Sequence, residues 1–165
     1  MRDPSIHPGA FVAPGARILG DVTVSDRAVI LFGVVIRAEF DRIEVGVESN
    51  VQDGTIVHCD EGVPAIIGDR VTIGHAAVVH GATIGDDCLV GIGSRALNGS
   101  RLGTGAWLGA GAILTEGRAI PPWTLALGIP ARSVRELTAE EVDRQRNGVA
   151  DYQRIAGMLR EHFSS

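Results

Sequence analysis

The aliphatic residues of this chain recur at intervals of six. The repeat occupies four runs: Val12 to Ile36, Val45 to Val57, Ile67 to Val79 and, after one skipped residue, Ile84 to Ile120. The fourth residue after each repeat position is mostly small. Runs of this kind predict one short structural unit repeated along most of the chain, so the repeat is considered before any single element.

A period of six residues matches neither a helix nor a simple strand. It does match a unit of one short strand and one tight corner, and three such units make a triangular coil of ~18 residues, stacked on the next by parallel strand pairing. The aliphatic residue then fills the interior, the small residue points inward near a corner, and glycine permits the sharp turns. The sequence predicts an all-β prism over about residues 12–120, interrupted at 39–42 and by a bulge at 60–64.

The last 45 residues follow another pattern. Ile120-Pro121-Pro122 ends the coils, and Thr138 with Glu141 forms a capping box that indicates a helix start. Helical spacing of apolar residues then predicts one amphipathic helix near 138–163, packed on the prism or on a neighbouring chain. We therefore expect a β-helix domain over 1–137 and a helix over 138–165, forming a single domain together.

Composition narrows the class of protein. The chain has 22 glycines, 4% aromatic residues and a net charge of −5, which excludes a disordered tail and argues against a nucleic-acid partner. Cys59 and Cys88 are too few for a disulfide scaffold, and we expect both to be structural. No apolar stretch is long enough to span a bilayer and no signal peptide is visible, so we expect a cytoplasmic protein without a membrane partner.

Three of the five histidines fall at informative positions of the repeat. His58 and His80 each follow an inward aliphatic residue, so both point outward, and their units lie one coil apart on the same face. His75 follows Ile73 by two and lies at a corner leaving another face. One chain does not readily bring His75 to an ion shared by the first two, whereas a neighbouring chain at a subunit interface can, which favours a homo-oligomer, most simply a homotrimer. Three histidine ligands leave one zinc position open, the pattern of a catalytic site.

The same positions place three further polar residues. Arg37 lies one coil below His58 on the same face, whereas Gln52 and Asp53 lie on the face of His75. We expect Gln52 to orient a metal-bound water. Asp53 either pairs with Arg37 across a subunit interface or orients a histidine. An interface role alone is the alternative for Arg37 and Asp53.

Several motifs resemble those of the gamma-class carbonic anhydrases. They are Gln52-Asp53-Gly54, His58, Val71-Thr72-Ile73-Gly74-His75, Val79-His80-Gly81, Ile84-Gly85-Asp86, Ile120-Pro121-Pro122 and Gly128-Ile129-Pro130-Ala131. The resemblance implies a left-handed parallel β-helix, a homotrimer, and zinc held by His58 and His80 of one subunit and His75 of the next. It also implies functional roles for Arg37, Gln52 and Asp53 in reversible hydration of carbon dioxide to bicarbonate.

Two positions depart from the family pattern. Arg37-Ala38-Glu39 stands where the family often has Arg-Gly-Asp, and the acidic loop that carries a proton shuttle is replaced by a short segment in which Glu61 is the candidate. Fe²⁺ or Co²⁺ also suits three histidines. Two other functions stay open: acyl chemistry, either coenzyme A thioester hydrolysis or an acyltransferase-like reaction, and a catalytically silent metal-binding scaffold.

Overall fold

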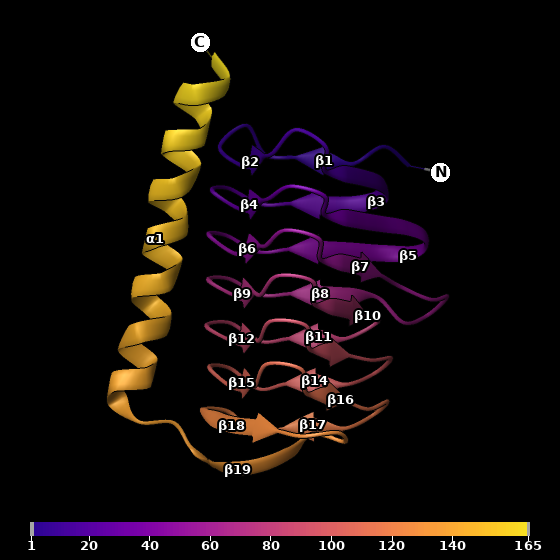
Figure 1. The fold of residues 1–165 in the computed structure, drawn as a ribbon. Coiled ribbons are helices and arrows are strands. Elements are labelled where there is room, and N and C mark those ends of the chain that lie inside the picture. Colours follow the sequence, from indigo (N-terminus) through magenta and orange to yellow (C-terminus); the bar gives the residue numbers. More distant parts are fainter. Residues whose placement is uncertain (1, 165) are drawn as a thin grey trace.

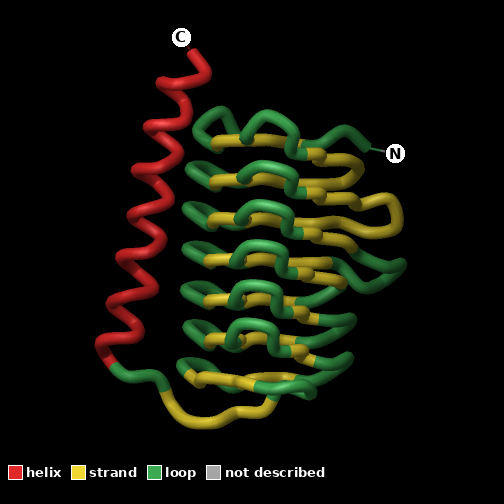
Figure 2. Tube along the Cα trace, viewed as in Figure 1, coloured by secondary structure: helices red, strands yellow, loops and turns green. Residues whose placement is uncertain are grey.

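The structure is a computed structural model that describes residues 2–164. The chain winds into a three-faced prism with one long helix beside it (Figure 1), and short strands alternate with turns throughout the coils (Figure 2). Parallel pairing stacks each coil on the next, which confirms the predicted left-handed parallel β-helix with a C-terminal helix.

Three columns of strands form the faces. The first column comprises β3 (Arg17–Val24), β5 (Val35–Val45), β7 (Ile56–His58), β10 (Val78–His80), β13 (Arg95–Ala96) and β16 (Ile113–Leu114). The second comprises β1 (Ser5–Ile6), β8 (Ala65–Ile67), β11 (Thr83–Ile84), β14 (Arg101–Leu102) and β17 (Ala119–Ile120), together with the later parts of β3 and β5. The third comprises β2 (Phe11–Val12), β4 (Val29–Ile30), β6 (Asn50–Val51), β9 (Thr72–Ile73), β12 (Leu89–Val90), β15 (Trp107–Leu108), β18 (Thr124–Leu127) and the antiparallel β19 (Arg132–Glu136).

The repeated aliphatic residues fill the interior of the prism. Ile30, Ile36, Ile73 and Leu108 are among the side chains that are fully buried. Burial of each such side chain stabilises the fold by roughly 1.5–3 kcal/mol. Val12, in the first coil, is only partly buried, because no complete coil lies beyond it.

The interruption at residues 39–42 does not end a strand. β5 continues from Val35 to Val45, pairing with β7 through its first residues and with β8 through its last. The extra residues carry β5 outward on the side away from the helix, where the loop after β7 also projects (Figure 1). In the bulge, by contrast, Asp60 and Val63 form an isolated antiparallel bridge.

The helix α1 (Ala139–Ser164) runs back along the third column of strands (Figure 1). The predicted capping box is confirmed: Glu141 N–H donates to Thr138 Oγ1 (3.2 Å), and Thr138 N–H donates to Glu141 Oε2 (2.9 Å). Ala156 and Leu159 pack against Phe11 and Leu31, so α1 covers the third face of its own chain. No helix among the described residues has the length and apolarity needed to cross a membrane.

Candidate metal centre

His58 and His80 meet on the first face. They end β7 and β10, where they are paired directly in the strand register, and Arg37 of β5 occupies the same row. His58 Nδ1 lies 2.9 Å from His80 Nε2. The repeat predicts this row. We call Arg37, His58 and His80, together with the supporting residues Asp60 and Asn98, the strand half of the site.

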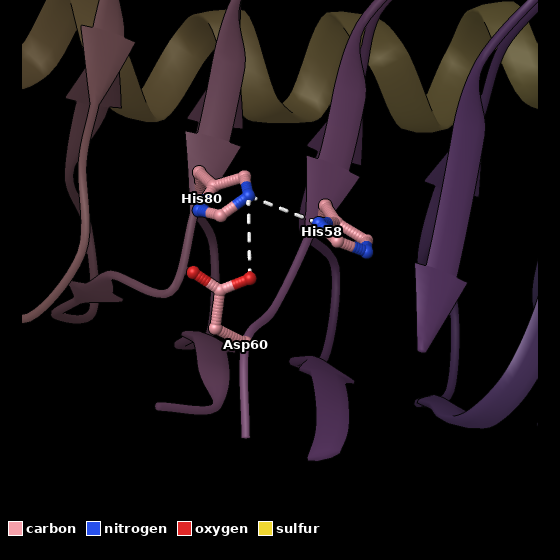
Figure 3. A group of neighbouring side chains, drawn as sticks. All are labelled: His58, Asp60 and His80. Atoms are coloured by element: carbon pink, nitrogen blue, oxygen red, sulfur yellow. Dashed lines mark hydrogen bonds and ion pairs between the residues drawn. The ribbon is translucent and has the colours of Figure 1, made fainter. Parts of the chain in front are cut away.

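Asn98 and Asp60 orient the ring of His80. Asn98 Nδ2 donates to Asp60 Oδ2 (2.6 Å), which turns Asn98 Oδ1 toward His80 Nδ1 at 2.8 Å. His80 Nδ1 therefore carries the proton, and Nε2 is left with a lone pair. Figure 3 shows this nitrogen facing both His58 and Asp60, whose Oδ1 lies 3.9 Å away.

The side chain of His58 is more buried than that of His80. Burial lowers the pKa of its imidazole, and the neighbouring Arg37 and His80 lower this pKa further, so the ring is neutral at neutral pH. Its Nε2 lies 3.3 Å from Glu39 Oε2, yet both atoms are buried without a hydrogen-bond partner. Glu39 contacts Arg37 through its other oxygen.

The second group lies at the corner between the third and first faces. Asp53 Oδ2 lies 2.9 Å from His75 Nδ1, and both side chains are about half exposed. Gln52 is buried, and its Nε2 donates to Asn50 Oδ1 (3.0 Å). Tyr152 of α1 is close by: burial raises the pKa of its hydroxyl, and the Asp53 carboxylate raises this pKa further. Gln52, Asp53 and His75 are called the corner half of the site.

The residues present fit a divalent metal ion. Among the described residues, His58, Asp60 and His80 offer ligand atoms that all lie within 4.8 Å of one another. Imidazole nitrogen and carboxylate oxygen are both ligands that Zn²⁺ takes. His75 is not part of this group, so one chain brings two of the three predicted histidine ligands together.

The repeat does not predict two of the residues that contact the histidines, Asp60 and Glu39. Asp60 falls in the bulge, where counting by six gives no position, although its place two residues after His58 is a usable signal. Glu39 reaches His58 because β5 continues as a strand, which puts Glu39 on the same side as Arg37. Glu61 is exposed in the bulge.

The two cysteines are buried, as the repeat predicts. Burial raises the pKa of the Cys88 thiol to about 12 and also raises that of Cys59. A thiol with so high a pKa is a poor nucleophile and a poor metal ligand at neutral pH. Cys59 Sγ donates to Asp41 O at 3.3 Å, which fits a structural role.

Fold and motif place the chain in a class of hexapeptide-repeat β-helices. The family model described as "Hexapeptide repeat of succinyl-transferase" matches residues 64–94 and 82–116. A solved structure of a hexapeptide transferase family protein from Anaplasma phagocytophilum superposes with a TM-score of 0.89 and 37% identity, covering 93% of this chain and 90% of that one.

Sequence relatives make the assignment narrower. A Methanocaldococcus jannaschii protein named "Probable carbonic anhydrase" is 46% identical over 157 residues, which cover 95% of this chain and 99% of that protein. Gamma carbonic anhydrase 2, a mitochondrial protein of Arabidopsis thaliana, is 35% identical over 147 residues, covering 86% of this chain and 53% of the plant protein. The chain belongs to the gamma-class carbonic anhydrase family, a family of lyases that hydrate carbon dioxide.

Proposed function

We propose that this protein is a zinc-dependent carbonic anhydrase whose sites lie at the subunit interfaces of a homotrimer. In each site His58 and His80 of one subunit and His75 of the next hold the metal. The observation that carries this proposal is that the three histidines lie at two separate places on one chain. Two meet at 2.9 Å on one face, while the third, held by Asp53, lies at another corner of the same chain. A cyclic trimer of prisms brings such a corner against such a face.

The proton positions of two rings support the proposal. Asn98 holds the proton of His80 on Nδ1, and the Asp53 carboxylate lies 2.9 Å from Nδ1 of His75, where it favours a proton on that nitrogen. In both rings Nε2 is then free to bind a metal, and the partner fixes the direction of the ring. The low pKa of His58 likewise favours the neutral ring that a metal requires.

Zinc held by His58, His80 and the next subunit's His75 would supply Lewis-acid chemistry suited to hydrating carbon dioxide at neutral pH. Gln52 orients the reacting oxygen through its side-chain amide. Arg37 supplies positive charge beside the developing bicarbonate and is held by Glu39. Proton release falls to buffer, because Glu61 is an exposed residue of the bulge and makes no contact with the histidines that the structure records.

The test is stopped-flow hydration of carbon dioxide by protein of counted zinc content, in low and high buffer. We expect activity proportional to zinc, higher in strong buffer, and absent in His75→Ala. Gln52→Ala should lose turnover while keeping its zinc, which separates catalysis from metal binding. A fully zinc-loaded trimer that hydrates no carbon dioxide would contradict the proposal.

Acyl chemistry is the competing function, favoured by one observation: the structural relative from Anaplasma phagocytophilum is described as a hexapeptide transferase. Acyl transfer in such folds needs a free histidine base, whereas His58, His80 and His75 are each engaged with another side chain. Hydrolysis of a coenzyme A thioester by the zinc-loaded protein, without hydration of carbon dioxide, would favour this alternative. A trimer that retains zinc and catalyses neither reaction would indicate the scaffold.

A further inference from the structure

A chain of buried hydrogen bonds joins the C-terminal helix to Gln52. Gln145 of α1 donates from Nε2 to Thr72 Oγ1 (3.2 Å), and Asn50 Nδ2 donates to the same oxygen (3.0 Å). Gln52 then donates to Asn50 Oδ1 (3.0 Å). All four side chains are buried, with exposed fractions from 0% to 8%. Burying a polar side chain costs free energy unless the side chain is hydrogen-bonded. This chain of hydrogen bonds therefore favours one arrangement of its side chains.

Backbone carbonyls fix the orientation of the Gln145 and Asn50 side-chain amides. Gln145 Nε2 also donates to Cys88 O (2.9 Å), and Asn50 Nδ2 also approaches Val71 O at 3.5 Å. A carbonyl oxygen only accepts, so the amide nitrogens of Gln145 and Asn50 must face these two groups. Asn50 is left with its oxygen toward Gln52, and Gln52 has to donate its own nitrogen inward.

We propose that Gln145 and Thr72 are positioning residues that make Gln52 present its carbonyl oxygen, a hydrogen-bond acceptor, to the reacting group. Within residues 2–164 no hydrogen bond to Gln52 Oε1 is found. An acceptor there holds the proton of a water or hydroxyl group and so directs the oxygen of that group. This inference rests on the proposed function for the role of Gln52, while the hydrogen-bond chain is tested separately.

Strand register explains why the helix can reach the site. Asn50 and Thr72 are direct neighbours in the pairing of β6 with β9, and both point outward on the face that α1 covers. Alternation along the strand puts Gln52 on the same side as Asn50, next to the corner. Gln145 on α1 therefore acts on Gln52 through Thr72 and Asn50, without contacting it directly.

The first test observes the Gln52 amide directly. The chain has three glutamines, Gln52, Gln145 and Gln153, so a spectrum of amide-¹⁵N-glutamine protein contains three side-chain signals. In Gln145→Met we expect the signal of Gln52 to move toward the shift of a solvated amide. Gln153→Met is the matched control, because Gln153 also bonds from α1 to backbone carbonyls, Arg27 O (2.9 Å) and Glu48 O (3.4 Å), but to none of the side chains that lead to Gln52. An unmoved Gln52 signal in Gln145→Met overturns the proposal, whatever the enzymatic activity.

The second test is kinetic and uses zinc-loaded protein. Gln145→Met should lower kcat about tenfold, the scale of one lost hydrogen bond, with KM and zinc content little changed. Gln153→Met should leave kcat as in the parent. If the parent protein hydrates no carbon dioxide yet the Gln52 signal responds, the proposed function fails and the hydrogen-bond chain stands.

A further pair of variants guards against misfolding. Gln145→Met leaves no backbone carbonyl unpaired, because Cys88 O still accepts from Thr72 N–H (3.0 Å). Thr72→Ser keeps the hydroxyl and should retain kcat and the Gln52 signal, whereas the isosteric Thr72→Val should alter both. Equal behaviour of the serine and valine variants would contradict a role for the hydroxyl.

Discussion

The two halves of the candidate site are built in different ways. The strand half places His58 and His80 on adjoining strands, and its supporting residues come from the bulge after β7 (Asp60) and from the next coil (Asn98). The corner half places His75 in a turn, where it is about half exposed. Its neighbour Gln52 depends on a helix some 90 residues further along the chain. Strand register fixes the row of Arg37, His58 and His80 in the first half, whereas the second half needs a tertiary contact and, in our proposal, a second subunit.

This difference has a consequence for assembly. One chain already holds the ligand atoms of the strand half within 4.8 Å of one another, so this half can bind a metal weakly before subunits associate. In the proposed trimer, the corner half contributes its ligand only when the next prism is in place. Metal affinity and oligomeric state should therefore be linked, as expected when a ligand binds one state of a protein more tightly than another.

The largest expected effect comes from mixing two inactive variants. His80→Ala damages the strand half and His75→Ala damages the corner half, so each homotrimer should lack tight zinc binding and hydration activity. Each mixed trimer should contain one complete site among its three interfaces, so random assembly of an equal mixture should regain about one complete site in four interfaces overall. The measurement is zinc content and hydration rate after joint refolding, compared with each variant refolded alone.

The control for this experiment mixes His58→Ala with His80→Ala. Both changes damage the strand half, so no interface in a mixed trimer can be complete and no activity should return. Recovery in this control, or none with His75→Ala, would show that the halves do not lie on different subunits.

The next largest effect is expected from the residues that orient the imidazole rings of His75 and His80. Asp53→Ala removes the partner of His75, and Asn98→Ala removes the partner of His80. Each should weaken zinc binding by about 10- to 100-fold, the usual cost of losing a residue that orients a metal-binding histidine. Competition with a chelator measures the affinity. Asp53→Asn keeps an acceptor and should recover most of the loss; if it binds zinc as poorly as Asp53→Ala, hydrogen bonding is not the role of Asp53.

The sequence predicts the strand half better than the corner half. Counting by six places Arg37, His58 and His80 in one row, because strand pairing repeats with the coil. The same counting gives His75 and Asp53 a shared corner but not their contact. It misses Asp60 and Glu39, which lie where the period is interrupted. Irregular segments carry no period, so their side chains can be placed only from the folded chain.

The helix shows the same limit. A capping box and helical spacing predict its start and its extent, because both depend on neighbouring residues in the chain. The match of Gln145 with Thr72 depends instead on how α1 slides along the third face, which no local pattern encodes. This is why the polar residue that supports Gln52 could not be identified from sequence.

A smaller effect is expected from a substitution at Gly81 that would push on Asn98, a supporting residue of the strand half. Gly81 follows His80 with a φ of +56°, and a Cβ there would collide with Asn98 Oδ1 and approach Val63 Cγ1 to 2.8 Å. Gly111, at φ +68°, has open space instead. Alanine at either position incurs a left-handed backbone cost of roughly 1–2 kcal/mol. Gly81→Ala should lose about 1–3 kcal/mol more, from overpacking, and should also weaken zinc binding.

Thermal and urea unfolding of the two glycine variants measure this difference. The zinc affinity of Gly111→Ala should equal that of the parent, since the change is remote from Asn98. Equal stability and equal zinc affinity in both variants would mean that Asn98 moves aside freely, and that its contact with His80 contributes little to the strand half.

The smallest effect lies at the start of α1, which supports the corner half alone. Hydrogen bonds from Arg135 and from the Thr138 backbone lower the pKa of Glu141 to about 2, from an ordinary 4.5. A carboxyl whose pKa is lower in the folded protein stabilises the fold above its unfolded pKa, and this contribution disappears as the pH falls from 4.5 toward 2. Glu141→Gln should therefore melt slightly below the parent at pH 7, and the gap should close in acid. A gap that persists at pH 2, or that is missing at pH 7, would contradict this role. Because α1 carries Gln145, the same variant at pH 7 should disturb the Gln52 amide signal slightly and leave zinc binding unchanged.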